Sequence, residues 1–92
     1  MQQNDTSNLT RVIPLEEMFM NKIDDILYGF LLIRATFDPN IKKLYLSNEK
    51  YLETRKEYMR IIKVSDRTIR NKVDKMIFLG YISKGSNRLI FN

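Results

Sequence analysis

One stretch decides the fold of this chain: VSDRTIRNKVDKMIFLGYI, residues 64–82. Ser65 is a residue type favoured at helix N-caps, where a side-chain oxygen accepts a hydrogen bond from a backbone N–H. Gly80 is the type that most often follows a helix, because it adopts left-handed backbone angles at no steric cost. These two signals predict a helix over residues 66–79.

The predicted helix has two distinct faces. Ile69, Val73 and Met76 recur at i, i+4 and i+7, which is the spacing of one buried helix face. The opposite face carries side-chain types that pair with base edges, arginine with guanine and asparagine with adenine. That face comprises Arg67, Arg70, Asn71, Asp74 and Lys75. The ordinary alternative is a charged helix side that only faces solvent.

A shorter helix is predicted immediately upstream. Thr54 and Glu57 have the spacing of a capping box, which predicts a helix over residues 55–62. A three-residue bend, Lys63 to Ser65, then leads into the second helix. Two short capped helices joined by a tight turn constitute a helix-turn-helix, here residues 55–79.

The segment after Gly80 predicts a β-hairpin. Two apolar runs surround the turn signal KGSN, so a hairpin is expected over residues 81–91 with a glycine at its tip. Lys84 and Arg88 flank the turn. They are expected to contact phosphates, which position a protein on DNA without reading its sequence. Alternatively, they only keep an edge hairpin soluble.

The N-terminal half contains a flexible arm and a helix. Residues 1–10 are polar and show no periodicity. Residues 11–15 allow a short strand, which Pro14 confines to a sheet edge or to the entry of a helix. Apolar residues at helical spacing predict one helix over residues 16–36, with a break allowed near Asn21. The apolar stripe includes Phe19, Ile23, Ile26, Leu27, Phe30, Leu31 and Ile33, and Leu32 and Ile33 make it wider than one core face needs. The surplus is either ordinary burial or a self-association surface.

The middle of the chain allows two interpretations. A proline and two turn-forming residues in FDPNI, residues 37–41, end the preceding helix. Residues 43–46 and 51–53 then read as two short strands of a loose hairpin. One longer helix over residues 49–62 is the alternative.

Composition excludes several classes of protein. The 92 residues suffice for one domain with one core. The sequence has neither cysteine nor histidine, so disulfides, thiolate metal sites and the commonest general base are absent. With no phosphate-binding loop and no metal-ligand spacing, a non-enzyme without a cofactor is expected. No apolar run of membrane-spanning length and no signal peptide is evident, which predicts a cytoplasmic protein without a membrane partner.

Charge is distributed unevenly along the chain. Residues 1–40 contain three basic and six acidic side chains, whereas residues 41–92 contain thirteen basic and five acidic ones. A basic half usually faces a polyanion, although a solvated basic surface is the simpler alternative.

The stretch TRKEYMRIIKVSDRTIRNKVDKMIFLGYI, residues 54–82, resembles bacterial and phage members of the winged helix-turn-helix superfamily. Those members have a turn ending in Val-Ser, then two variable residues, then Thr-Ile or Thr-Val, and Leu-Gly-Tyr/Leu-Ile before the wing. The resemblance implies an α+β fold over residues 11–92, with about three helices, a small sheet and a C-terminal wing. It also implies DNA contacts at Asp66, Arg67, Thr68, Arg70 and Asn71.

The start of the domain adds a looser resemblance. VIPLEEMF, residues 12–19, is similar to the opening of the N-terminal winged-helix domain of replication initiators from low-GC plasmids and phages. Two features depart from the superfamily pattern. Lys63 stands where glycine is common, and Ile77 and Phe78 stand where polar residues are usual. Phe78 either tucks under the wing or belongs to a protein-binding patch.

The expected function is sequence-specific binding to double-stranded DNA, as a small transcriptional regulator of a plasmid, phage or other mobile element. It would act by occupying its site, with base contacts from the helix and backbone contacts from lysines and the wing. Since the sequence runs only to Asn92, just after the wing, a homodimer is expected to form through the first helix or the N-terminal arm. The residues expected to contact DNA are Lys63, Ser65, Asp66, Arg67, Thr68, Arg70, Asn71, Lys72, Lys75, Lys84, Asn87 and Arg88.

Two other functions fit the same sequence. A replication-origin or partition-site binding protein would use the same surface together with a second partner surface. A winged helix used for protein–protein contact would instead present Ile77 and Phe78 to a protein partner.

Overall fold

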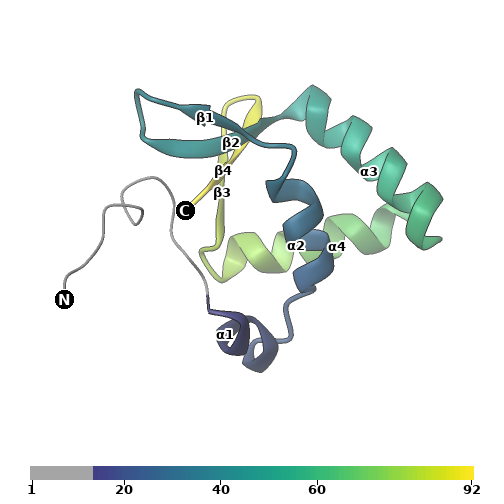
Figure 1. Ribbon diagram of the computed structural model, residues 1–92. Helices are drawn as coiled ribbons and strands as arrows, with labels where there is room; N and C mark the ends of the chain where they lie inside the picture. The colour runs from purple at the N-terminus through teal and green to yellow at the C-terminus, as the bar shows by residue number, and fades with distance from the viewer. Residues whose placement is uncertain (1–13) are drawn as a thin grey trace.

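The computed structural model describes residues 14–92, so the arm expected at residues 1–10 lies outside the described part. The described part is an α+β arrangement of four helices and one four-stranded antiparallel sheet (Figure 1). The expected α+β class is therefore confirmed, with one helix more than predicted. In chain order the elements are α1 (Leu15–Met20), α2 (Asp25–Leu32), β1 (Thr36–Asp38), β2 (Lys43–Ser47), α3 (Asn48–Ile62), α4 (Asp66–Phe78), β3 (Ile82–Gly85) and β4 (Arg88–Phe91).

The sheet joins the middle of the chain to its C-terminal end. Its strand order is β1-β2-β4-β3, and every neighbouring pair is antiparallel. Leu46 of β2 lies opposite Leu89 of β4, and both side chains are buried on the face that meets the helices. The strand predicted at residues 43–46 is confirmed. Strand β1 is not predicted by the sequence pattern, which places a turn over residues 37–41.

The C-terminal hairpin is confirmed, but its turn differs from the predicted one. Strands β3 and β4 pair as far as Gly85 opposite Arg88, so the turn consists of Ser86 and Asn87. Asn87 has φ of 60°, a left-handed conformation that asparagine tolerates. Gly85 lies within β3 and not at the tip. An added Cβ there would stand 3.3 Å from the Ile90 side chain, so this glycine serves close packing.

Helix α3 overturns the predicted strand at residues 51–53 and the predicted start at Arg55. Ser47 caps the helix by accepting a hydrogen bond from the Lys50 backbone N–H at 3.1 Å, so helix formation begins seven residues earlier. Thr54 is no cap, because it is buried within the helix. Its hydroxyl donates to the Lys50 carbonyl oxygen at 2.7 Å. The alternative prediction, one longer helix over residues 49–62, is confirmed.

The first predicted helix is two helices. The chain leaves α1 at Met20 and passes through a left-handed residue, Lys22, with φ of 57°. Asp24 then caps α2, accepting a hydrogen bond from the Leu27 N–H at 3.0 Å. A new cap restarts the helix along a different direction, so the break allowed near Asn21 is confirmed. The predicted end at residue 36 is wrong, since Thr36 already belongs to β1.

Helix α4 follows the prediction closely. Ser65 accepts a hydrogen bond from the Thr68 N–H at 3.1 Å, and Gly80 has φ of 85°. The helix itself ends at Phe78, one residue before the predicted end. The residues predicted to face inwards, Ile69, Val73 and Met76, are all buried.

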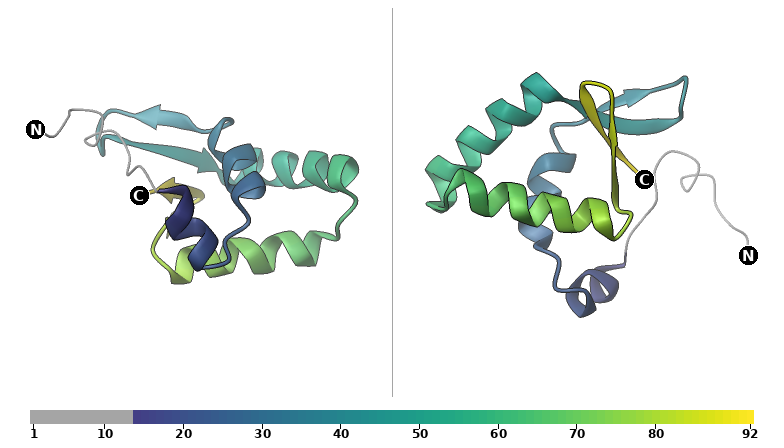
Figure 2. Two further views of the ribbon diagram at one scale, coloured as in Figure 1. Left: turned by 60° about the horizontal axis from the view of Figure 1, so that its bottom comes forward. Right: turned by 180° about the vertical axis from the view of Figure 1, so that it is seen from behind.

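The core lies between the inner face of the sheet and the helices α2, α3 and α4. Tyr28 of α2 packs edge-on against Tyr81 and Phe91, with ring centroids 6.4 and 5.9 Å apart. Helix α2 crosses in front of α4 in Figure 1 and behind it in the right-hand view of Figure 2. The two helices therefore cover opposite sides of the core.

Part of the predicted first-helix core faces solvent instead. Phe19, Ile26 and Ile33 are 81%, 65% and 76% exposed, whereas Leu27 and Leu31 are fully buried. Because the chain forms two short helices, the single continuous stripe assumed from the sequence does not exist. The surplus apolar side chains remain on the surface. Among residues 14–92, none of the helices has the length and apolar character needed to cross a bilayer.

Lys63, which stands where the superfamily commonly has glycine, is the left-handed residue of the turn between α3 and α4. Lys63 has φ of 67° and ψ of 43°, and its side chain is exposed.

Replacing Lys63 by glycine should stabilise the protein by about 0.5–1 kcal/mol, because relief of left-handed strain exceeds the added flexibility of the unfolded chain. Urea unfolding measures the change. Lys56→Gly, in the middle of α3, is the control and should destabilise by about 1 kcal/mol; equal losses in both variants would contradict the strain.

Candidate nucleic-acid interface

The outer face of α4 is formed by the side chains opposite its buried residues. Arg67, Asn71 and Phe78 lie roughly 160–200° from Ile69 at 100° per residue, and all three are exposed. In the described part of the chain, neither Arg67 nor Asn71 has a side-chain hydrogen bond or ion pair. Their donors therefore point to solvent. The predicted outward orientation is confirmed for the whole set, which comprises Arg67, Arg70, Asn71, Asp74 and Lys75.

The start of α4 is held by its own side chains. The Ser65 and Thr68 hydroxyl oxygens lie 2.9 Å apart, in addition to the capping bond from the Thr68 N–H. Both residues are expected DNA contacts. In this structure their hydroxyls fix the geometry of the helix start, which lies two residues after the exposed Lys63.

Asp66 connects the two helices of the motif. One carboxylate oxygen accepts from Arg55 Nε at 2.7 Å and the other from Arg70 Nε at 2.8 Å. The hydrogen bond from Arg55 is the main reason that the pKa of Asp66 lies below its ordinary value. Since both carboxylate oxygens are engaged, Asp66 orients Arg70. It is poorly placed to accept a hydrogen bond from a base.

This bridge predicts a stability that depends on acidity. A carboxyl group whose pKa is lowered by folding contributes stability that is present above its unfolded pKa, near 3.8, and is lost as the pH falls through the folded pKa. Asp66→Asn should therefore destabilise the protein at pH 7, and the difference from the wild type should shrink at pH 3. Urea unfolding at a series of pH values measures it. A difference that stays constant across that range would contradict the role assigned to the carboxylate.

One cation of the hairpin lies on the same side of the molecule as α4. Lys84 pairs with Leu89 across the hairpin, and since Leu89 faces the core, Lys84 projects from the helix-facing side of the sheet. It lines a shallow cavity of about 190 Å³ together with Arg70 and Asp74 of α4. The structure thus brings Lys84 and Arg70 together.

The other cation of the hairpin lies on the opposite face of the sheet. Arg88 pairs with Gly85, one position out of phase with Lys84, so its side chain projects away from the helices. Its Nη1 donates to Asp38 Oδ2 at 2.8 Å, and its guanidinium carbon stands 4.9 Å from the centre of the Tyr45 ring. The structure does not bring Arg88 to the outer face of α4. Asn87, at the turn, accepts a backbone hydrogen bond from the start of α3.

The second flank of α4 faces the connection between α1 and α2. Lys72 Nζ lies 2.7 Å from Asp24 Oδ2, and Lys75 Nζ lies 3.5 Å from the Lys22 carbonyl oxygen. Burial alone would raise the pKa of Asp24, but the hydrogen bonds from Lys72 and from the backbone more than offset it, so the pKa lies below its ordinary value. These residues line a cavity of about 500 Å³ whose apolar wall includes Phe19.

Sequence reasoning misses three residues that pair with expected DNA contacts: Arg55, Asp24 and Asp38. Each pairs with an expected DNA contact that lies 11, 48 or 50 residues away along the chain. Among the ion pairs of α4 and the hairpin, only that of Asp66 and Arg70 could be predicted from the sequence, because the two residues stand at i and i+4 of one helix.

Comparison of the chain with models of protein families, with curated proteins and with solved structures finds no match. Within residues 14–92, no group of three or more acidic side chains is placed to hold a metal ion.

Proposed function

We propose that this chain is a winged helix-turn-helix protein that binds double-stranded DNA, with α4 as the helix that enters the major groove. The order of elements supports the proposal: α3, a three-residue turn, α4 and then a hairpin that joins the sheet through β2. In this class, the second helix of the motif reads bases and the hairpin lies beside it.

The observation that carries the proposal is the exposed pair of Arg67 and Asn71. Both lie in the first half of α4, and both present hydrogen-bond donors that the described part of the chain does not use. Arginine pairs with guanine O6 and N7, and asparagine with adenine N6 and N7.

The two flanks of α4 support the same arrangement. A helix lying in a major groove about 12 Å wide has a phosphate backbone on each side. Arg70 and Lys84 lie on one flank of α4, and Lys72 and Lys75 on the other. Phosphate contacts from both flanks would fix the orientation of the helix, and the exposed Lys63 would add a contact near its start.

Selection from a randomised duplex pool tests the proposal. The purified chain is expected to retain duplexes that share a defined motif, and Arg67→Ala/Asn71→Ala is expected to retain none in common. Arg60→Ala is the matched control, because it removes an arginine of α3 whose side chain is 72% exposed. Enrichment of no motif by the unaltered chain would refute base reading by α4.

For the biological process, we propose transcriptional regulation by occupancy in a plasmid, phage or other mobile element. Binding at a replication origin or partition site would use the same face of α4. The arrangement of the selected motif separates the two: clustered repeats with cooperative binding favour origin or partition binding, and isolated sites favour repression.

A second function is supported by Phe78, which is 87% exposed at the C-terminal end of the outer face of α4. The alternative in which it tucks under the hairpin is wrong, whereas its neighbour Ile77 does pack against the core. An exposed phenylalanine fits a protein-binding surface. Loss of a protein complex in Phe78→Asp, with DNA binding unchanged, would support this second function.

A further inference from the structure

A cavity of about 500 Å³ lies where α1 and its connection to α2 meet α4. The connection passes beside α4 in both Figure 1 and Figure 2. The buried Ile23 and the exposed ring of Phe19 form its apolar wall, and the charged side chains around it are Lys22, Asp24, Lys72 and Lys75. Sites for small organic molecules have volumes of roughly 300–1,000 Å³ and mostly apolar walls with a few polar groups. The cavity therefore has the size and the lining of a small-molecule site.

The charges around this cavity are unequal, with three lysines and one aspartate. Both carboxylate oxygens of Asp24 are engaged within the protein. Oδ1 accepts from the Leu27 N–H at 3.0 Å, and Oδ2 accepts from Lys72 Nζ at 2.7 Å. Lys72 and Asp24 thus compensate each other, and the positive charges of Lys22 and Lys75 remain.

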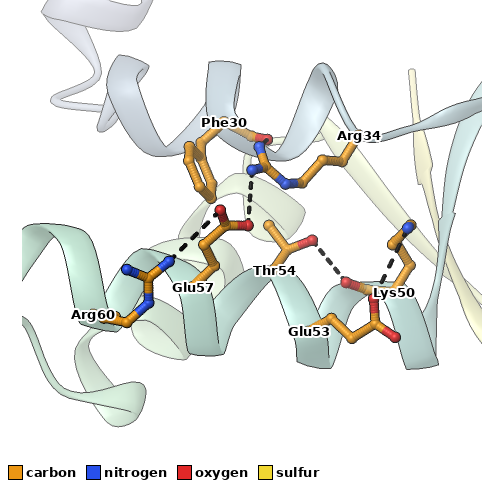
Figure 3. A network of polar contacts seen from close by, with 7 residues as sticks. All are labelled: Phe30, Arg34, Lys50, Glu53, Thr54, Glu57 and Arg60. Carbon is orange, nitrogen blue, oxygen red and sulfur yellow. Dashed lines mark hydrogen bonds and ion pairs between the residues drawn. The ribbon is translucent and has the colours of Figure 1, made fainter.

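Lys22 and Lys75 have no carboxylate partner within residues 14–92. Lys75 Nζ lies 3.5 Å from the Lys22 carbonyl oxygen, and the Lys22 ammonium group forms no hydrogen bond or ion pair there. An ammonium group has three N–H donors, so both lysines keep donors for an anion. Figure 3 shows the opposite case, in which Arg34 is already paired with Glu57, at 2.8 Å.

The distribution of charge determines where in the cavity an anion can lie. Asp25 lines a smaller cavity of about 160 Å³ that shares Phe19 and Ile23 with the larger one. Asp25 would repel an anion there, whereas Lys22 and Lys75 attract one beside α4. An anionic group is therefore expected on the α4 side, with an attached apolar part against Phe19 and Ile23.

Lys22 has a left-handed backbone conformation, with φ of 57°. Glycine adopts this conformation without steric cost, whereas it strains a lysine. The Lys22 ammonium group bonds to no described residue, so the fold of residues 14–92 does not require a lysine at this position. A ligand held by that ammonium group would account for it.

We infer that this cavity binds an organic carboxylate with an apolar body. The two carboxylate oxygens would accept hydrogen bonds from Lys22 and Lys75, and the apolar body would cover Phe19 and Ile23. An uncharged apolar molecule would leave the two ammonium groups without an anion. A small hydrophilic anion would leave the apolar wall in contact with water.

An NMR titration of the isotope-labelled chain with 2-naphthoate tests the site. The amide signals of residues 19–23 and 72–75 are expected to shift in a saturable manner. 2-Naphthamide, which has the same rings without the charge, should bind about tenfold more weakly. Acetate should bind more weakly still, because it covers little of the apolar wall. No saturable binding of 2-naphthoate at millimolar concentrations, or equal affinities for 2-naphthoate and its amide, would overturn the inference.

Lys22→Gly provides a variant whose fold is not at risk, because glycine suits the left-handed conformation. It should weaken the binding of 2-naphthoate about tenfold, since one of the two cations is lost. Lys42→Gly is the matched control, because Lys42 is also exposed and left-handed, with φ of 56°, but does not line the cavity. If both variants bind 2-naphthoate with the affinity of the unaltered chain, the inference is wrong.

The consequence for DNA rests on the proposed function. Lys75 is one of the cations expected to contact phosphate on this flank of α4, and a carboxylate bound to it would compete with that contact. Saturating 2-naphthoate should therefore weaken binding to the selected duplex about tenfold, as measured by fluorescence anisotropy. The duplex should weaken the binding of 2-naphthoate by the same factor.

The ligand site and the proposed function fail independently in these experiments. A chain that binds 2-naphthoate in the cavity but binds no DNA would refute the proposed function and leave the ligand site standing. A chain that selects a DNA motif but binds no 2-naphthoate would refute the ligand site alone. Equal affinity for the duplex with and without bound 2-naphthoate would refute the competition at Lys75.

Discussion

Arg67→Ala/Asn71→Ala is expected to abolish the preference of the protein for its own site. Each bidentate contact between a side chain and a base contributes about 1–3 kcal/mol of discrimination. Together the two losses correspond to at least about a thirtyfold weaker binding to the selected site. The affinity for unrelated duplexes should change little by comparison, because the phosphate contacts remain. Fluorescence anisotropy with the selected and a scrambled duplex measures both.

The contrast between base contacts and backbone contacts makes this prediction specific. Lys84→Ala should weaken binding to both duplexes by a similar factor, because a lysine beside a phosphate carries no sequence information. Arg60→Ala, on α3, should affect neither. If Arg67→Ala/Asn71→Ala lowers both affinities equally, α4 contacts only the backbone. The recognition of bases would then have to be assigned to another element.

Phe91→Ala is expected to have the largest effect on folding. Phe91 is fully buried and packs against Tyr28, so it joins the last strand to α2. Truncating a buried phenylalanine costs about 3–5 kcal/mol, and a whole domain is stable by only about 5–15 kcal/mol. Most of the folded population should be lost on mild heating. Urea unfolding followed by far-ultraviolet circular dichroism measures the difference.

Phe78→Ala is the matched control for this substitution. The residue type and the truncation are the same, but Phe78 is 87% exposed. Its loss should change the free energy of unfolding by less than about 0.5 kcal/mol. Comparable losses in the two variants would mean that Phe78 is covered in solution, as it would be in a stable self-association through the outer face of α4.

The local signals in the sequence predicted the helix α4 and its surroundings well. Ser65, Gly80 and the inward triplet of Ile69, Val73 and Met76 act through contacts within a few residues, so the pattern alone suffices. The orientation of α4, and hence the exposure of Arg67, followed from the same spacing.

The start of α3 could not be predicted from local capping rules alone. Ser47 and Thr54 are both good capping types, and each is followed at a plausible distance by a helix-forming stretch. The choice depends on the sheet, since β2 delivers the chain to Ser47 and burial takes Thr54 into the helix. Burial is a property of the whole fold. The capping box at Thr54 was therefore a misleading local match.

The side of the sheet on which Lys84 and Arg88 each lie could not be predicted from local sequence either. Arg88 and Lys84 are four residues apart and look equivalent in sequence. The register of the hairpin sends them to opposite faces of the sheet, and only Arg88 meets Asp38. Pairing with residues about 50 positions away depends on how the strands and helices are assembled.

The ion pairs of α4 and the hairpin bear on how ionic strength would act on binding. Arg70, Lys72 and Arg88 each have a carboxylate of the protein within 2.8 Å, which serves as a built-in counterion. Only a cation that pairs with a DNA phosphate releases condensed counterions from the duplex, at about 0.9 per phosphate contact. Cations already neutralised by the fold contribute less to this entropy of release. The dependence of DNA binding on salt concentration would therefore follow the number of basic side chains without a carboxylate partner. The total number of basic residues in the sequence overstates this dependence.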